Sequence, residues 1–265
     1  MTSSPLLDIP PLDIPFLVPG DARVPGDART EAPPRRLVAE VELVDRLEDA
    51  DPPSWLPLTH DDRVRLAAFR REGDARRFVT GRVMVHRRLR EVRGVPLGAA
   101  RFTRRFTAAG EWKPVLSGEP GRGFEGTQWP DVSISHSGTF VAVAFCEGAE
   151  VGIDVEQHSA FVDGDDVLSM ALTPQERARV ASIADAARVF TAKEAVLKAV
   201  GFGLAIDPLL VEVLDGAVRR FDHPERRPVV LAPVPVPDRL SGLVSATVAI
   251  APVSSPGSGS RTDQP

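Results

Sequence analysis

Three acidic side chains and a lysine have the types and spacing to share a cation. Asp154 and Glu156 are two residues apart in an apolar, β-branched segment, so in a strand both carboxylates leave the same face. Glu194 and Lys198 are four residues apart in a helical pattern and therefore lie one above the other on one helix surface. Carboxylate oxygens are the ligands that a hard divalent cation prefers, and such a cation also holds phosphate groups. If the helix packs beside the strand, the pattern indicates a magnesium and phosphate site.

Each part of this pattern also has an ordinary structural interpretation. Two acids in one strand commonly form a solvated edge, and Glu and Lys four residues apart commonly form an exposed ion pair worth about 0.2–0.5 kcal/mol. The apolar setting favours a functional site, because acids beside a buried strand need a partner. Gly152, within the same segment, permits the close approach of another backbone.

The net charge of −5 conceals a strongly basic segment. Between Arg63 and Arg105 there are fourteen arginines and three acidic residues, a net charge of +11 before histidines are counted. These arginines indicate either solvated helix faces or a polyanionic ligand. Aromatic residues are not interleaved with them as on a base-stacking surface, so nucleic acid is not expected as a partner. A small polyphosphate fits better.

Composition divides the chain into a body and two ends. Residues 1–36 duplicate Leu-Asp-Ile-Pro and then Val-Pro-Gly-Asp-Ala-Arg, with more proline than a helix interior or central strand accepts, so we expect a disordered leader. Residues 253–265 are expected to form a flexible tail. The body is expected to comprise an N-terminal half, 37–150, with the basic wall, and a C-terminal half, 151–252, with the acids.

The chain has no signal for a membrane or for secretion. No run of 18 apolar residues occurs, and the N-terminus lacks a basic region followed by an apolar segment, so a cytoplasmic location is the default expectation. The one cysteine, Cys146, lies in an apolar run and is expected to be a buried thiol.

Hydrophobic periodicity predicts helices packed on a mostly antiparallel sheet, an α+β fold. Strands are predicted at Val38–Val44, Phe102–Phe106, Lys113–Leu116, Val132–Ser135, Phe140–Phe145, Val151–Glu156, Leu209–Leu214, Val229–Leu231 and Leu243–Ala251. Helices are predicted over Asp61–Glu72, over Ala75–Arg90, after a capping box at Thr173–Glu176, and in a segment ending near Val200 before Gly201.

Two ungapped motifs give the chain a specific resemblance. Gly152-Ile153-Asp154-Val155-Glu156 and Phe190-Thr191-Ala192-Lys193-Glu194-Ala195-Val196-Leu197-Lys198 resemble the two signature motifs of the double-length, surfactin-type 4′-phosphopantetheinyl transferases. Trp112-Lys113-Pro114 is similar to the Gly-Lys/Arg-Pro turn of that family, with Trp112 in place of glycine. Ser133-Ile134-Ser135-His136-Ser137 is similar to its Asn-Ile-Ser-His-Ser strand, with Ser133 in place of asparagine. The likeness covers about residues 60–205.

The resemblance implies an enzyme that transfers 4′-phosphopantetheine from coenzyme A to a serine of an apo acyl, peptidyl or aryl carrier protein. The reaction would depend on Mg²⁺, release 3′,5′-ADP and serve polyketide or nonribosomal peptide biosynthesis. The implied fold has two similar α+β halves related by a pseudo-two-fold axis. A monomer whose halves imitate a dimer is therefore expected.

The resemblance also implies a role for each site residue. Asp154, Glu156 and Glu194 would bind Mg²⁺, and Glu194 and Lys198 would be catalytic, with Glu194 either a metal ligand only or also the base. The residues implied in coenzyme A binding are Arg77, Lys113, Ser135, His136, Lys193 and Lys198.

Other functions remain as alternatives. The same acids and cations could serve a metal-dependent hydrolase of coenzyme A or of a nucleotide diphosphate, or a non-catalytic module that binds coenzyme A or a carrier protein. The dinucleotide-like pattern Gly121–Gly126 is interpreted as a loop, because no apolar strand precedes it and no helix can follow. His60, His86, His158 and His223 lack metal-ligand spacing and are interpreted as structural or surface residues.

Overall fold

The structure, a computed structural model, describes residues 11–14, 37–106, 112–118, 129–162, 165–224 and 226–253. Its strands are β1 (Leu12–Ile14), β2 (Leu37–Val44), β3 (Arg101–Phe106), β4 (Trp112–Ser117), β5 (Asp131–Ser137), β6 (Phe140–Cys146), β7 (Ala149–Gln157), β8 (Val211–Leu214), β9 (Ala217–Phe221), β10 (Val230–Pro233) and β11 (Val244–Pro252). Its helices are α1 (His60–Ala68), α2 (Glu72–Arg93), α3 (Asp165–Ala171), α4 (Pro174–Arg177), α5 (Ile183–Ala199) and α6 (Asp238–Ser241), with 3₁₀ turns η1 (His158–Phe161), η2 (Gly203–Ala205) and η3 (Pro208–Leu210).

The strands form two larger sheets and two hairpins. The larger sheets have the orders β1-β2-β6-β5 and β10-β11-β7, and β3-β4 and β8-β9 are separate hairpins. Every strand pair with a backbone ladder in the described ranges is antiparallel. The chain therefore has the mixed α+β architecture expected from its periodicity.

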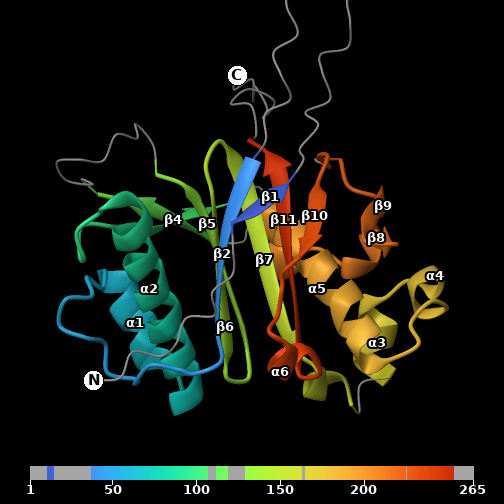
Figure 1. The fold of residues 1–265 in the computed structure, drawn as a ribbon, viewed down its shortest axis with the longest axis horizontal. Helices are drawn as coiled ribbons and strands as arrows, with labels where there is room; N and C mark the ends of the chain where they lie inside the picture. Colours follow the sequence, from blue (N-terminus) through green and yellow to red (C-terminus); the bar gives the residue numbers. More distant parts are fainter. Residues whose placement is uncertain are drawn as a thin grey trace, which may run out of the picture.

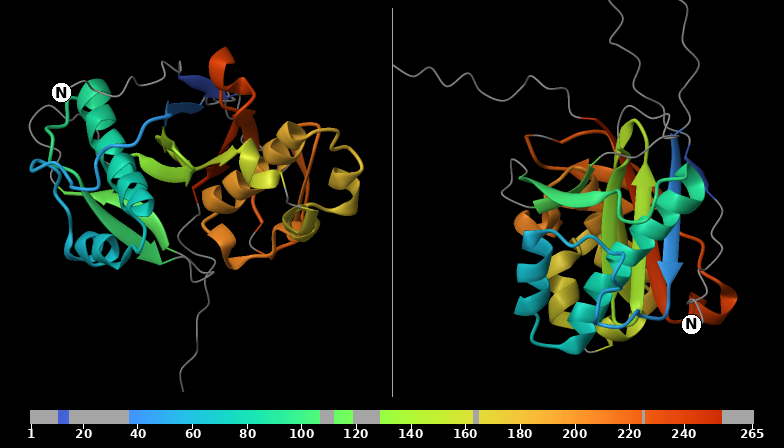
Figure 2. Two further views of the ribbon diagram at one scale, coloured as in Figure 1. Left: turned by 90° about the horizontal axis from the view of Figure 1, so that it is seen from below. Right: turned by 90° about the vertical axis from the view of Figure 1, so that its left-hand side faces the viewer.

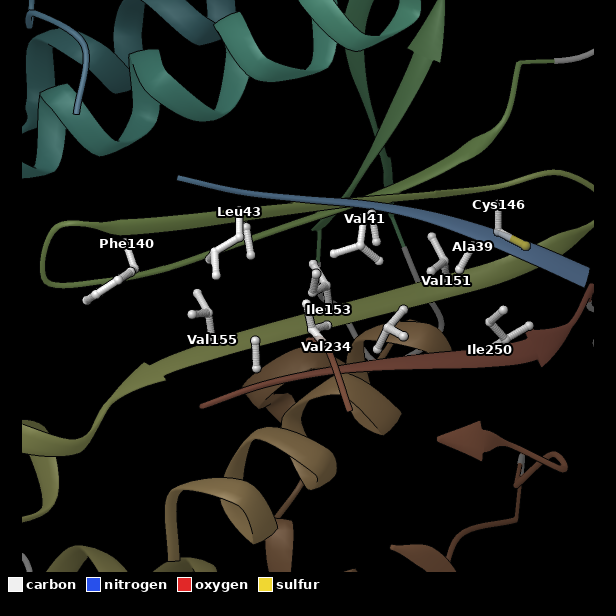
Figure 3. Packing of buried hydrophobic residues seen from close by; sticks show 14 of the residues in the cluster. Ala39, Val41, Leu43, Phe140, Cys146, Val151, Ile153, Val155, Val234 and Ile250 are labelled. Carbon is white, nitrogen blue, oxygen red and sulfur yellow. The ribbon is translucent and has the colours of Figure 1, made fainter. Parts of the chain in front are cut away.

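The two larger sheets face each other across one apolar core. Alternate residues of β2 and β7, among them Val41, Leu43, Ile153 and Val155, meet there (Figure 3). Helix α2 packs on the outer side of β6 and β5, and α5 packs on the outer side of β7 and β11. The strands of the two larger sheets thus lie between α1 and α2 on one flank and α3 to α5 on the other (Figures 1 and 2).

A strand, a long helix and two strand pairs occur twice along the described chain, with α1, α3, α4 and α6 as additional elements. Strand β2, helix α2, hairpin β3-β4 and hairpin β5-β6 are followed by β7, α5, β8-β9 and β10-β11 in the same sequence. The sheet orders β2-β6-β5 and β7-β11-β10 correspond strand for strand.

Local signals explain where several helices begin and end. Thr59 and Thr173 each form a capping box with the acid three residues on, and the predicted box at Thr173–Glu176 is confirmed. Gly201 has φ +83°, which confirms the predicted left-handed residue after α5. The prediction of a helix over Asp61–Glu72 was too long: the backbone is extended at Phe69 and Arg71, so α1 stops early and α2 starts at Glu72.

The predictions for the two chain ends and for the cysteine have different outcomes in the structure. The interpretation of residues 1–36 as an entirely disordered leader was wrong for Leu12–Ile14, which form β1 on the edge of β2. The rest of the leader, most of the expected tail and the Gly121–Gly126 pattern lie outside the described residues. Cys146 is buried as predicted, and burial raises its pKa to about 12. Within the described ranges, no helix is both long and apolar enough to cross a membrane.

Candidate functional site

Helix α5 lies against β7 because residue 152 has no side chain. A Cβ at Gly152 would lie 2.1 Å from the carbonyl oxygen of Ala195 and 2.4 Å from the amide nitrogen of Ala199. Backbone atoms in a helix cannot move aside for a methyl group, so only glycine fits at this crossing. The close approach sets Glu194 and Lys198 against the polar face of β7. The condition on which the sequence pattern depended, that this helix packs beside this strand, is met.

Asp154 is the centre of the resulting cluster. Its side chain is 2% exposed, and its Oδ1 accepts hydrogen bonds from Ser135 Oγ at 2.7 Å and from Lys198 Nζ at 2.6 Å. Lys198 Nζ also donates to Ser135 Oγ at 2.9 Å. The second oxygen, Oδ2, is buried and has no hydrogen-bond partner among the described residues. Oδ1 of Asp154 therefore accepts two hydrogen bonds, and Oδ2 is available to a ligand.

Glu156 and Glu194 carry charge that their surroundings disfavour. Glu156 accepts a hydrogen bond from Ser137 Oγ at 2.6 Å, yet burial and the charge of Asp154 raise its pKa to about 7. Burial, again followed by the charge of Asp154, raises the pKa of Glu194 to about 7. Glu194 is 4% exposed, and its buried Oε1 has no hydrogen-bond partner in the described part of the chain. The cluster therefore favours proton uptake or a positive ligand.

Cations from the first half face the same end of β5. Arg77 of α2 donates to the carbonyl oxygen of Gly138 at 2.9 Å, in the turn that follows Ser137. Surrounding protein atoms lower the pKa of His136, and the charges of Arg77, Lys198 and Arg65 lower it further, although the side chain keeps an exposed surface. Four of the residues expected to bind coenzyme A, namely Arg77, Ser135, His136 and Lys198, thus lie around one end of β5.

Lys193 does not reach this cluster. Its side chain is 0% exposed, and its Nζ donates to Glu176 Oε2 at 2.6 Å. Glu176 also closes the capping box at Thr173 and accepts from the amide of Val213. Neighbouring residues on a helix point in different directions, so Lys193 faces away from the surface that presents Glu194. The structure therefore places Lys193 in a buried ion pair with Glu176, and its contact with coenzyme A stays a prediction.

Lys113 also bonds a residue outside this cluster. Its Nζ bonds Asp131 Oδ2, and the lysine is 6% exposed. Asp131 opens β5 four residues before Ser135, roughly 13 Å along the strand at about 3.3 Å per residue. The same Asp131 oxygen accepts from the amide of Val151 at 2.7 Å. Asp131 thus joins β5 to β7 and holds Lys113 at this end of the strand, and the contact of Lys113 with coenzyme A stays a prediction.

A row of polar side chains on β5 attaches it to β7, a feature that the sequence interpretation missed. The amides of Val151, Ile153 and Gln157 donate to Asp131, Ser133 and Ser137 respectively. The constant offset of 20 residues aligns the two strands in parallel, with side chains replacing a backbone ladder. Alternation of polar residues from Asp131 to Ser137 is the signal that could have identified it.

The residues fit a divalent cation chemically, although they do not form a closed ligand set. Within the described residues, no three His, Cys, Asp or Glu side chains are arranged as a metal site. Lys198 Nζ provides the positive charge next to Asp154. The buried, unpartnered oxygens Asp154 Oδ2 and Glu194 Oε1 are nevertheless hard donors that a cation such as Mg²⁺ would satisfy.

Comparison with known proteins concerns the part of the chain that carries the acids. Residues 150–229 match the ACPS family model, described as the 4′-phosphopantetheinyl transferase superfamily. This segment is similar to that superfamily. It contains Asp154, Glu156, Glu194 and Lys198, and the match supports a transferase that moves phosphopantetheine. A search of curated proteins finds no match.

Proposed function

We propose that the chain transfers 4′-phosphopantetheine from coenzyme A to a serine of an apo acyl, peptidyl or aryl carrier protein. The observation that carries the proposal is the crossing at Gly152, which sets Glu194 and Lys198 against Asp154 inside the segment that matches the superfamily. The unpartnered oxygens at this crossing suit a phosphate-bound cation.

The acids would hold the metal of the reaction. Asp154, Glu156 and Glu194 are the proposed ligands of Mg²⁺, whose charge would neutralise the pyrophosphate and the departing 3′,5′-ADP. The metal charge would offset the burial, and after it the repulsion from Asp154, that now raise the pKa values of Glu156 and Glu194. Ser135 and Ser137, which donate to Asp154 and Glu156, fix the directions of these two carboxylates.

The cations of the first half would bind the phosphates of coenzyme A. Arg77, with Arg65 nearby, forms a positive wall opposite the acids, and His136, whose pKa is lowered by burial and by these charges, lies beside it. Lys198, which lies between wall and acids, would neutralise the phosphate that is transferred. We propose structural roles for Lys113 and Lys193, since both are held in buried or nearly buried ion pairs.

The chemical step exchanges one phosphorus–oxygen bond for another. The serine oxygen forms a bond to the phosphorus next to pantetheine, the pyrophosphate bond breaks, and 3′,5′-ADP leaves with the electron pair. The Glu194 carboxylate, whose Oε1 has no hydrogen-bond partner among the described residues, accepts the serine proton.

The matching order of elements in the two halves supports the finer family features. We propose that residues 37–150 and 151–252 are related by a pseudo-two-fold axis, as in the double-length, surfactin-type members, and that the chain is a monomer. The support is the shared strand order, β2-β6-β5 and β7-β11-β10.

Mass spectrometry of apo carrier proteins tests the function. Purified protein, coenzyme A and Mg²⁺ should add the phosphopantetheine mass to at least one member of a panel of fatty-acid, polyketide and peptide-synthetase carriers. Glu194→Gln should remove this activity, whereas Glu147→Gln, an exposed acid on the β6–β7 turn, should keep it. If no carrier gains mass and 3′,5′-ADP is released from coenzyme A alone, the protein is a hydrolase. If neither product forms, it is a binding module.

A further inference from the structure

The leader contributes a strand to the folded body. Strand β1 pairs antiparallel with the start of β2, with Leu12 opposite Ala39 and Ile14 opposite Leu37. It is the outermost strand of the four-stranded sheet, beside β2 (Figure 1). Leu12 packs against the central core, as do Val230 and Ala232 of β10. The leader therefore covers an edge that would otherwise expose unpaired backbone groups.

Prolines limit this strand to three residues. Pro11 precedes Leu12 and Pro15 follows Ile14, and proline has no N–H to extend a ladder. The paired segment is the core of the second Leu-Asp-Ile-Pro copy. The first copy, Leu7 to Pro10, has the same four residues five positions earlier.

The two copies cannot act as successive parts of one strand. If the register of β1 continued toward the N-terminus, Leu7 would lie opposite Val44. Leu7 and Leu12 are an odd number of residues apart, so they would point to opposite faces of the sheet. Pro10 and Pro11 would also interrupt the ladder. The repeat can therefore supply two alternative strands for the same position beside β2.

We propose that the outer edge of β2 at Leu37–Ala39 is a docking site for a single Leu-Asp-Ile strand, and that Leu7–Ile9 and Leu12–Ile14 of the same chain alternate in it. Docking of the first copy lengthens the connection to β2 from 22 to 27 residues. By loop-closure entropy this makes it only about 1.4-fold less populated than the second. The two copies thus compete on nearly equal terms.

Hydrogen exchange of the full-length protein, followed by mass spectrometry on peptides covering Leu37–Val44, tests the proposal. Leu7→Asn with Ile9→Asn, and separately Leu12→Asn with Ile14→Asn, should each keep exchange within about threefold of the unmodified chain. The variant with all four changes should exchange about tenfold faster or more at Leu37–Ala39. Leu6→Asn with Leu17→Asn, which changes two leader leucines outside the copies, is the matched control and should have no effect.

Three results would overturn the proposal. One is full loss of protection when only Leu12 and Ile14 are changed, because the first copy would then not dock. Another is unchanged protection in the four-site variant. Protection that depends on protein concentration would also overturn it, since the strand would then come from a second chain.

A peptide experiment separates loss of docking from loss of folding. Exchange in β6 and β11 should be unaltered in the four-site variant. Adding the peptide Pro-Leu-Asp-Ile-Pro at millimolar concentration to that variant should restore protection of Leu37–Ala39. The peptide Pro-Asn-Asp-Asn-Pro should not, and equal restoration by both peptides would contradict recognition of Leu and Ile.

Discussion

Helices α2 and α5 occupy corresponding places on the two sheets, but the buried charged groups at the two helices differ in how completely they are paired. On α2, Arg82 donates to Asp62 at 2.9 Å and its guanidinium carbon lies 3.9 Å from the ring centroid of Phe102. On α5, Glu194 lies beside Asp154, and each has a buried oxygen without a hydrogen-bond partner in the described ranges. Arg82 on α2 is thus stabilised by partners within the chain, whereas Asp154 and Glu194 each keep a carboxylate oxygen ready for a ligand.

The largest expected difference concerns the glycines at the two helix crossings. Gly152→Ala would place a methyl group 2.1 Å from a backbone oxygen, whereas Gly81→Ala would meet the Ile134 side chain at 2.9 Å, which can rotate. We expect Gly152→Ala to lower the free energy of unfolding by about 3 kcal/mol and to abolish transfer, and Gly81→Ala to change stability by about 1 kcal/mol or less. Urea denaturation measures both. Equal stability of the two variants would show that the α5 crossing tolerates a methyl group.

A pair of charge substitutions should separate stability from activity. Asp62→Ala leaves Arg82 buried without its carboxylate and should lower the free energy of unfolding by about 3 kcal/mol, with the transfer rate per folded molecule within about twofold. Glu194→Gln should reduce transfer at least about 100-fold and, at pH 8 without Mg²⁺, raise stability by about 1 kcal/mol. Denaturation and carrier-loading rates provide the measurements. A Glu194→Gln protein that is active but unstable would reverse the assignment.

The two halves should also depend on pH with opposite sign. Burial lowers the pKa of His86 from 6.5 to about 4, so its contribution to stability is lost as pH falls through that range. Burial raises the pKa values of Glu156 and Glu194 from 4.5 to about 7, so their contribution is present below pH 4.5 and lost as pH rises toward 7.

Denaturation between pH 4 and 8, without Mg²⁺, measures these two slopes. His86→Gln should flatten the rise in stability from pH 4 to 6.5, and Glu194→Gln should reduce the fall between pH 4.5 and 7. If neither variant changes the profile, the titrating groups lie elsewhere.

The smallest expected effect distinguishes two serines of the β5–β7 contact. Ser137 bonds both Glu156 and the amide of Gln157, whereas Ser133, among the described residues, bonds the amide of Ile153. Ser137→Ala and Ser133→Ala should each cost about 1 kcal/mol of stability. Only Ser137→Ala should raise the Mg²⁺ concentration needed for half-maximal transfer, by about tenfold. Titration with Mg²⁺ measures this, and equal shifts would mean that Ser137 does not orient Glu156.

Local patterns predicted most of the body but few of its short or peripheral elements. Long alternating or helical segments, such as β7, β11 and α5, were located within a few residues. Strand β9, helix α3 and strand β1 were missed. β1 was missed because its formation depends on a partner edge 25 residues away, which composition does not reveal. The prolines of the leader correctly excluded a central strand and are compatible with a short outer one.

The sequence by itself determined the acids, their common strand face and the glycine that permits the helix crossing, because these depend on residue type and local period. Tertiary structure decided which cations join them. Lys193 and Lys113 both lie in motifs that resemble the family. Lys193 bonds Glu176 because it lies on a different face of α5 from Glu194, and Lys113 bonds Asp131 because it lies near the first residue of β5. Ser137 was not among the predicted site residues. It donates a hydrogen bond to Glu156 because β5 and β7 run in parallel at a fixed offset. Packing sets the relative direction and distance of two elements. The spacing of residues along one element does not encode either of them.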